Sequence, residues 1–345
     1  MYKKIFMGIA AVAALTLVSC SSDDLNSLSD NSSKNEAISF DGYLGRSAVA
    51  VNGSRGSVLD LPALKGENVG FGVFGNYNEA NDLEFGSNLF DNVKVYWSSS
   101  SEPAKWKYDN TKYWPTEGHI DFLAYAPHVD GTTLKNKSCI DFTVDGDVAK
   151  QEDLLWANAK NQTKDQNSGE NKVNFTFNHA LAKIGYTVKT SAHDAGTTIK
   201  LNKITLAGSA DGKVKAFYPK GTINLSTGDW TPSTSDEKQN FEWFSNASGT
   251  DVTTNATGNE SGNFLFVIPQ KFSTSPSDEL YVIVEYTIQT GSTTMKSRVS
   301  SKITKDFDKG KAYTINLTLG LTPIEFDVTT VEKWIEGGKE DITLK

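Results

Sequence analysis

The chain alternates apolar and polar residues over many short stretches, and this period of two constrains its fold more than any other feature. Successive side chains of a strand point to opposite faces, so alternation predicts a strand with one buried face. Clusters of Gly, Asn, Ser, Asp and Thr separate the stretches, as turns do. The stretches are Ile38/Phe40, Val69/Phe71/Val73, Val93/Val95/Trp97, Ile120/Phe122/Ala124, Val173/Phe175/Phe177, Ile184/Tyr186/Val188, Ile204/Leu206, Phe264/Phe266/Ile268, Leu280/Val282/Val284/Tyr286 and Ile315/Leu317/Leu319. We therefore predict an all-β protein built from β-sandwiches.

A polar run divides this strand series near its middle. Residues 158–171 (NAKNQTKDQNSGEN) contain almost no apolar side chain, so they are the candidate boundary between an N-terminal β-sandwich domain, 38–170, and a C-terminal one, 171–345. A long surface hairpin loop inside one domain would have the same composition. The longest stretch with helical character is the short segment 178–182, so little helix is expected.

The first residues have the pattern of an export signal. Lys3 and Lys4 precede a short apolar run, and Leu17-Val18-Ser19 leads into Cys20. A permanent membrane helix needs about 20 apolar residues, so this run is too short to remain as one. The pattern resembles the signal of bacterial lipoproteins, which implies that residues 1–19 are removed and that acyl chains on Cys20, palmitate among them, anchor the protein to the outer membrane. Residues 20–37 are then a flexible tether, and a plain secretory signal that contains a cysteine is the alternative.

Charge and cysteine content exclude several kinds of partner and cross-link. The formal charge is −8, and loss of Lys3 and Lys4 with the signal leaves −10 (−8 − 2), without a basic patch that could follow a phosphate backbone. Nucleic acid is therefore not expected as a partner. The chain has two cysteines, and with Cys20 acylated Cys139 has no partner for a disulfide within the chain.

Motifs that would indicate an enzyme, a cofactor or a metal site are weak. Residues 70–75 match GxGxxG, but no helix-like sequence follows to bind a pyrophosphate, so we interpret them as part of a glycine-rich strand. Glu152 and Asp153 are adjacent, and adjacent strand residues point to opposite faces, so a solvated strand edge is the favoured interpretation. The histidines, His119, His128, His179 and His193, lack the spacing of metal ligands. We predict no enzymatic activity, no cofactor and no metal.

Arginine is rare in this chain, and its placement is informative. The 34 basic residues include only three arginines, Arg46, Arg55 and Arg298. Arg46 and Arg55 follow the first predicted strand in Gly-, Ser- and Ala-rich sequence, and such loops are where proteases cut. Cleavage after either residue would separate the first strand from the rest of the chain. We favour Arg55, because Asn52-Gly53-Ser54 before it is the more loop-like sequence. Two ordinary solvated arginines are the alternative.

The C-terminus carries a second alternating segment beyond the last strand of the series. Its apolar residues are Ile324, Phe326, Val328, Val331 and Trp334. Residues 324–327 and 38–41 share the order I-x-F-D. This similarity raises the hypothesis that the C-terminal segment can occupy the groove that the N-terminal strand fills.

A series of motifs covers nearly the whole mature chain. They are the lipoprotein signal, the first strand followed by arginine, Tyr113–Pro115 with Ile120–Pro127, Gln151–Ala157, Phe177–Lys183, Val267–Gln270, and the ending from Gly310–Tyr313 to Val331–Trp334. In this order and spacing they resemble the fimbrillin family, the subunits of type V pili. The resemblance implies two transthyretin-like Greek-key β-sandwich domains in tandem.

The resemblance also implies a mode of assembly. Family members are exported as lipoproteins, cut after an arginine by a trypsin-like protease, and polymerised by strand exchange. For this chain it implies loss of the first strand by cleavage after Arg46 or Arg55, and donation of a strand within 321–345 to a neighbouring subunit. The residues lost with the first strand would include Ile38, Phe40 and Leu44. The implied partners are other pilus subunits, an arginine-specific protease and, before maturation, the outer membrane; the implied destination is an adhesive fimbrium at the cell surface.

Two alternative functions stay open at this point. A pilus anchor subunit would share the family but escape cleavage and keep its lipid. A surface-anchored lipoprotein that binds glycans would use aromatic side chains to stack on sugar rings. The candidates for such stacking are Trp97, Trp106, Trp114 and Trp156, although large residues in alternating segments more often belong to a core.

Overall fold

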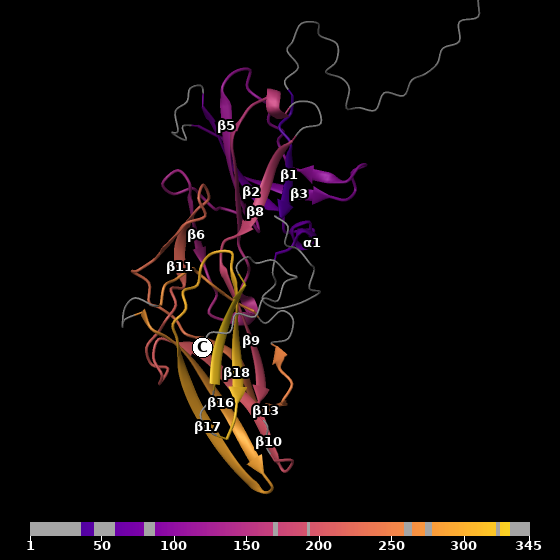
Figure 1. Cartoon of the computed structure of the whole chain (residues 1–345). Coiled ribbons are helices and arrows are strands. Elements are labelled where there is room, and N and C mark those ends of the chain that lie inside the picture. The colour runs from indigo at the N-terminus through magenta and orange to yellow at the C-terminus, as the bar shows by residue number, and fades with distance from the viewer. Residues whose placement is uncertain are drawn as a thin grey trace, which may run out of the picture. The chain divides into compact units, whose positions relative to one another are not determined.

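Strands make up nearly all the regular structure of the protein (Figure 1). The computed structural model describes residues 36–44, 59–78, 87–167, 172–191, 194–258, 264–272, 278–321 and 325–331, all within one unit that spans Glu36–Lys345. Among these residues the helical pieces are α1 (Leu61–Leu64) and two 3₁₀ turns, Val148–Lys150 and Asp165–Asn167. The all-β prediction is confirmed. No helix in the described part of the chain has the length and apolarity needed to cross a membrane.

The N-terminal strand lies at the edge of a seven-stranded sheet. The strand order is β1-β8-β7-β5-β2-β3-β4. The strands are β1 (Phe40–Leu44), β8 (Val173–His179), β7 (Leu155–Gln162), β5 (His119–Ala126), β2 (Phe71–Asn78), β3 (Ser87–Ser98) and β4 (Lys105–Lys107). β1 pairs with β8 in parallel, whereas all other neighbours in this sheet are antiparallel. Figure 1 shows β1 beside β8.

The polar run of the sequence connects two neighbouring strands of this sheet. It begins within β7, and β8 follows it and pairs with β7 through Leu155↔His179 and Trp156↔Asn178. This is the connection expected of a loop inside one domain, so the division of the chain at residue 170 stays a prediction. The segment with helical character, residues 178–182, forms no helix: β8 ends in it at His179, and β9 (Ala182–Thr190) begins at its last residue.

The glycine-rich motif forms a strand, as predicted. Residues 71–78 are β2, which lies between β5 and β3 and is buried along nearly its whole length. A Cβ atom on Gly72 would lie 2.4 Å from Cε1 of Tyr125, and one on Gly75 would lie 2.8 Å from ring atoms of Phe122 and Phe90. These glycines therefore leave room for aromatic rings and bind no phosphate in this arrangement.

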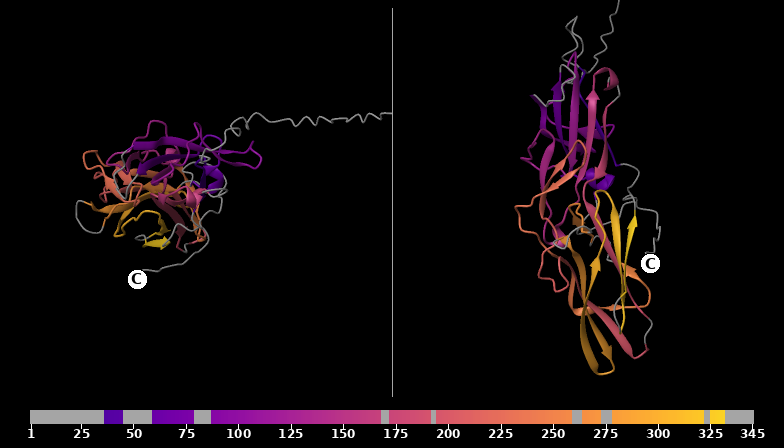
Figure 2. Two further views of the ribbon diagram at one scale, coloured as in Figure 1. Left: turned by 90° about the horizontal axis from the view of Figure 1, so that it is seen from above. Right: turned by 60° about the vertical axis from the view of Figure 1, so that its left-hand side comes forward.

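Three further sheets complete the described fold. The four-stranded sheet has the order β13-β10-β16-β17, the three-stranded sheet β12-β11-β6, and the five-stranded sheet β14-β9-β18-β19 with β15 also paired to β9. Their strands are β6 (Cys139–Thr143), β9 (Ala182–Thr190), β10 (Thr197–Ala207), β11 (Lys220–Asn224), β12 (Trp230–Pro232), β13 (Phe241–Val252), β14 (Thr257–Gly258), β15 (Leu265–Val267), β16 (Leu280–Thr290), β17 (Thr293–Ile303), β18 (Ala312–Leu319) and β19 (Glu325–Val331). The last two strands are the yellow pair in Figure 2.

Two hydrophobic clusters fill the space around these sheets. The first includes the rings of Phe40, Phe71, Phe90, Phe122 and Phe175. The second includes the apolar residues of β9, β10, β16 and β18, together with Phe74, Leu123 and Tyr125 from the seven-stranded sheet. Because β2 and β5 contribute to both clusters, they are covered on both faces, which explains why their sequences are apolar with little alternation.

Candidate functional site

The segment that carries β1 is hydrogen-bonded on both of its edges. On one side β1 pairs with β8 from Phe40↔Val173 to Leu44↔Phe177, and the N–H of Val173 donates to the carbonyl of Ser39 at 2.9 Å. On the other side, the N–H of Ile38 donates to the carbonyl of Lys112 at 2.9 Å. The chain just before β1 therefore enters between two other segments.

The side chains of this segment enter the first hydrophobic cluster. Ile38 is 1% and Phe40 2% exposed, and Leu44 packs against the same cluster. Four aromatic rings surround Phe40. Their centroids lie 5.3 Å (Phe90), 5.4 Å (Phe122), 5.5 Å (Tyr108) and 5.7 Å (Phe175) from its own. Removal of β1 would therefore open an aromatic-lined trough along β8 and leave the backbone of β8 unpaired on that edge.

The opposite face of β1 points outward. Tyr43 is 50% exposed, and its hydroxyl donates to Oδ2 of Asp41 at 3.1 Å. The nearby negative charge of Asp41 raises the pKa of the Tyr43 phenol. β1 thus has one buried and one solvent-facing side, and the buried side holds the apolar residues that the sequence alternation placed together.

The proposed processing residues lie outside the described residues. Arg46 and Arg55 fall in the interval between the end of β1 at Leu44 and Leu59, and Cys20 precedes the described part of the chain. Since both arginines follow β1, a cut after either one would detach the whole strand from the body of the protein. The choice between them, like acylation of Cys20, stays a prediction.

A buried carboxylate holds the chain where it re-enters the body after this interval. Asp153 is fully buried, and its Oδ2 accepts hydrogen bonds from the N–H of Leu59 at 3.2 Å and from Nδ1 of His179 at 2.7 Å. Its Oδ1 has no hydrogen-bond partner among the described residues. His179 is the last residue of β8, the strand that pairs with β1. This contact therefore links the start of the body to the strand beside the trough.

The solvated strand edge predicted for Glu152 and Asp153 is wrong for Asp153. Glu152 is exposed, but Asp153 points inward to the histidine and to the backbone of Leu59. Asp153 and His179 could each be identified in the sequence as a candidate polar residue, but they lie 26 positions apart. Nothing in the sequence pattern pairs them, since the pairing depends on the register of β7 and β8.

The C-terminal segment forms a strand at the edge of its sheet. β19 pairs with β18 in antiparallel fashion, from Thr318↔Glu325 to Ala312↔Val331. Val328 is partly buried against the second hydrophobic cluster. Phe326 and Val331 lie within this strand, whereas Ile324 and Trp334 lie outside the described residues. In the described part of the sheet β18 is the only neighbour of β19, so one row of backbone bonds holds it.

The four candidate tryptophans do not form an exposed stacking surface. Trp106 is 7% and Trp114 3% exposed, and both belong to the first cluster, as their place in alternating sequence predicted. Trp97 packs against the same cluster, and Trp156 packs against the second. Among the described residues, no group of three His, Cys, Asp or Glu side chains could hold a metal ion.

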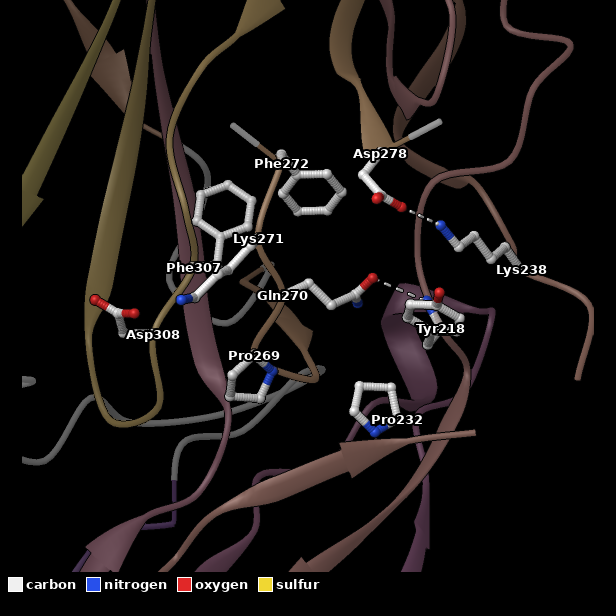
Figure 3. A pocket seen from close by; sticks show the side chains of 10 residues that line it. All are labelled: Tyr218, Pro232, Lys238, Pro269, Gln270, Lys271, Phe272, Asp278, Phe307 and Asp308. Carbon is white, nitrogen blue, oxygen red and sulfur yellow. Dashed lines mark hydrogen bonds and ion pairs between the residues drawn. The ribbon is translucent and has the colours of Figure 1, made fainter. Parts of the chain in front are cut away.

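A cavity of about 350 Å³ lies in the C-terminal half of the chain (Figure 3). Nζ of Lys238 lies 3.0 Å from Oδ1 of Asp278 and 4.5 Å from the ring centroid of Tyr218. Oε1 of Gln270 accepts a hydrogen bond from the N–H of Tyr218 at 3.2 Å, and its Nε2 donates to the carbonyl of Ile268 at 3.1 Å. These polar groups bind one another, and none of them is a nucleophile beside a base.

Comparisons with known proteins give one matching family model and several similar structures. A family model described as fimbrillin-like matches residues 65–334. A fimbrial protein from Bacteroides vulgatus has a similar structure, with a TM-score of 0.68 and 22% identity over 87% of this chain and 100% of that chain. The tip fimbrial protein Mfa3 from Porphyromonas gingivalis, with a C-terminal truncation, aligns with a TM-score of 0.41 and 12% identity over 80% of this chain and 96% of that chain. No curated protein matches the chain significantly.

Proposed function

The chain belongs to the fimbrillin-like family, and we propose that it is a fimbrial subunit that is exported as a lipoprotein, cut after an arginine and polymerised by exchange of β1 for a strand of a neighbouring subunit. Its role is then structural, without enzymatic activity. Its partners are other pilus subunits and, at the stage of maturation, an arginine-specific protease. Acylated Cys20 holds the precursor at the outer membrane until cleavage releases it into the fimbrium.

The observation that carries this proposal is the position of β1. It is an edge strand, its apolar side chains fill the aromatic trough, and the interval that holds Arg46 and Arg55 joins it to the rest of the chain. Loss of such a strand exposes unpaired backbone groups and an apolar surface, which is a strong template for another strand. The intact precursor, with its own strand in place, has this template covered and should stay monomeric.

The C-terminal strand is the proposed donor. β19 is an edge strand with a single described neighbour, so it can leave its sheet without disturbing the order of the strands that remain. Burial of Ile324, Phe326 and Val328 in a neighbour's trough would contribute about 1.5–3 kcal/mol each before ordering costs. Donation from one end of a subunit to the other end of the next is a head-to-tail contact that does not close, and such contacts produce filaments.

Trypsin treatment of the purified precursor tests the proposal. We expect a new N-terminus at Ser47 or Gly56, followed by ladders of oligomers that resist SDS. Three single variants separate the sites: Arg46→Ala, Arg55→Ala, and Arg298→Ala as the matched control in β17. We expect Arg55→Ala to block processing and ladders, and Arg298→Ala to leave both unchanged.

Two outcomes would contradict the proposal or its details. Loss of processing only in Arg46→Ala would move the cleavage site to Arg46 and leave strand exchange intact. A wild-type chain that loses its first strand but forms no ladder would refute polymerisation by strand exchange. N-terminal sequencing and intact mass identify the cut in each case, so the two outcomes are separable.

A further inference from the structure

The segment from Glu36 to Phe40 occupies a two-sided space, which we call the β1 slot. Residues 112–114 form one wall, and the N–H of Trp114 donates to the carbonyl of Glu36 at 3.0 Å there. β8 forms the other wall through its pairing with β1. Because both walls offer backbone donors and acceptors, any occupant must be an extended strand, but these bonds do not by themselves distinguish one side chain from another.

Tyr108 is the side chain that contacts both the backbone and a side chain of the occupant. Its hydroxyl donates to the carbonyl of Ile38 at 2.8 Å and accepts from the N–H of Lys112 at 3.2 Å. Its ring packs against Phe40 at 5.5 Å with a 55° angle between the planes, and against Phe90 at 5.5 Å with a 65° angle. The Tyr108 phenol is protonated at neutral pH, and burial raises its pKa further.

These two contacts fall two residues apart on the occupant. The hydroxyl binds the carbonyl of position 38 and the ring packs on the side chain of position 40, and residues i and i+2 of a strand share one face. We infer that Tyr108 is a specificity-determining residue of the β1 slot, which selects strands that carry an aromatic residue two positions after the carbonyl it binds. This inference rests on the proposed strand exchange and names the feature by which an incoming strand is chosen.

The occupant that fits this rule is the C-terminal segment of a second copy of this chain. Residues 324–327 repeat the I-x-F-D order of residues 38–41, and the other I-x-F sequences of the chain, at 120–122 and 140–142, do not continue with Asp. Alignment of the two segments places the carbonyl of Ile324 at Tyr108 Oη and the ring of Phe326 in the position of Phe40. A shift by one residue would turn every side chain to the other face and lose both contacts.

Peptide binding to the cleaved protein tests the inference. The probes are labelled peptides of residues 321–334 with the natural sequence and with Phe326→Leu. The proteins are full-length precursors treated with trypsin: wild type, Tyr108→Phe, Tyr108→Leu, and Tyr281→Phe as a control, since Tyr281 lies on β16, outside the β1 slot, and its hydroxyl donates to Oε2 of Glu279 at 3.0 Å. Fluorescence polarisation gives each affinity, and SDS-resistant ladders are followed in parallel.

We expect each variant to change a different quantity. Tyr108→Phe loses the neutral hydrogen bond to the peptide carbonyl, together with the one from the Lys112 N–H, and should weaken binding of both peptides about 2- to 10-fold, with the preference for Phe over Leu unchanged. Tyr108→Leu loses the ring that packs against the aromatic residue of the peptide. Wild type should bind the natural peptide about 2- to 10-fold more tightly than the Phe326→Leu peptide, and in this variant that ratio should fall towards one. Tyr281→Phe should match wild type in both measurements. A merely structural role of Tyr108 would lower affinity without changing the ratio between the two peptides.

The results that overturn the inference differ from those that overturn the proposed function. If wild type forms ladders and binds the peptide, but the Tyr108 variants keep wild-type affinity and preference, strand exchange stands and the role of Tyr108 is refuted. If Tyr108→Leu lowers affinity but keeps the preference, the selective role is likewise refuted. If cleaved wild type neither forms ladders nor binds the peptide, strand exchange and the inference fail together.

Discussion

Truncation of Phe40 to alanine measures how strongly the precursor holds its own first strand. The ring is 2% exposed and is enclosed by the rings of Phe90, Phe122, Phe175 and Tyr108, at centroid distances of 5.3–5.7 Å. Its burial alone is worth about 1.5–3 kcal/mol. Phe90, Phe122 and Phe175 belong to strands β3, β5 and β8, which limits how far their rings can move into the space left behind, so a cavity term adds to this loss. We therefore expect Phe40→Ala to lower the free energy of unfolding of the precursor by about 3–5 kcal/mol.

Urea unfolding followed by tryptophan fluorescence is the assay. Trp106 and Trp114 are buried in the same cluster as Phe40, so their emission reports on this part of the protein. Tyr43→Ala is the matched control, because it truncates an aromatic residue of the same strand that is 50% exposed; its effect should stay within about 0.5 kcal/mol. A midpoint shift for Phe40→Ala no larger than that of Tyr43→Ala would refute the view that β1 is held through this ring.

Two further predictions concern groups that the strand exchange does not use. Asp153→Ala removes the acceptor of the Leu59 N–H and of His179 Nδ1, so it should destabilise the protein by about 1–3 kcal/mol for each of these two buried hydrogen bonds that is lost, measured by urea unfolding. The exposed control Glu152→Ala should be near neutral, and equal effects of the two variants would contradict the buried contact. Burial raises the pKa of Tyr313 to about 12, so the unfolded phenol ionises first and stability should fall as the pH rises from about 10 to about 12. Unfolding at several alkaline pH values should show a shallower decline in Tyr313→Phe, and identical slopes would refute this assignment.

The strands could be predicted from the sequence because most of them have one buried face. β8 alternates buried and exposed residues along its whole length, and β18 alternates buried and partly buried ones, so their period of two reports directly on burial. The alternation predicted around Phe71/Val73 and Ile120/Phe122/Ala124 is incomplete, because both faces of β2 and β5 are covered. Glycine or further apolar residues, such as Phe74 and Leu123, interrupt it and weaken the signal. The alternation of apolar and polar residues in a strand thus indicates how many of its faces are buried, but it does not indicate which strand lies beside it.

The candidate site could be predicted only where it depends on local sequence. Ile38 and Phe40 were recognisable as the buried face of a strand, whereas cleavage after Arg46 or Arg55 stays a prediction. The contact between Asp153 and His179 and the double role of Tyr108 could not be found, because each joins residues that are close only once the strands are in register. Tyr108 lies 70 positions from the carbonyl that it binds. Long-range contacts of this kind produce no periodic pattern in the sequence, so they cannot be predicted from it.

The place of β1 in the topology decides whether its replacement can leave the domain folded. β5 lies between β7 and β2, so its loss would divide the seven-stranded sheet into two pieces, each with a new open edge. β1 has only β8 beside it in the strand order, so its loss shortens the sheet by one strand and leaves the other pairings unchanged. Residues 36–38 also bond to residues 112–114 of the body, but these bonds are not covalent, so one cut after β1 is enough to break the covalent link of this segment to the body. An N-terminal edge strand with a large buried ring therefore combines a stable precursor with a site that a single proteolytic event can open.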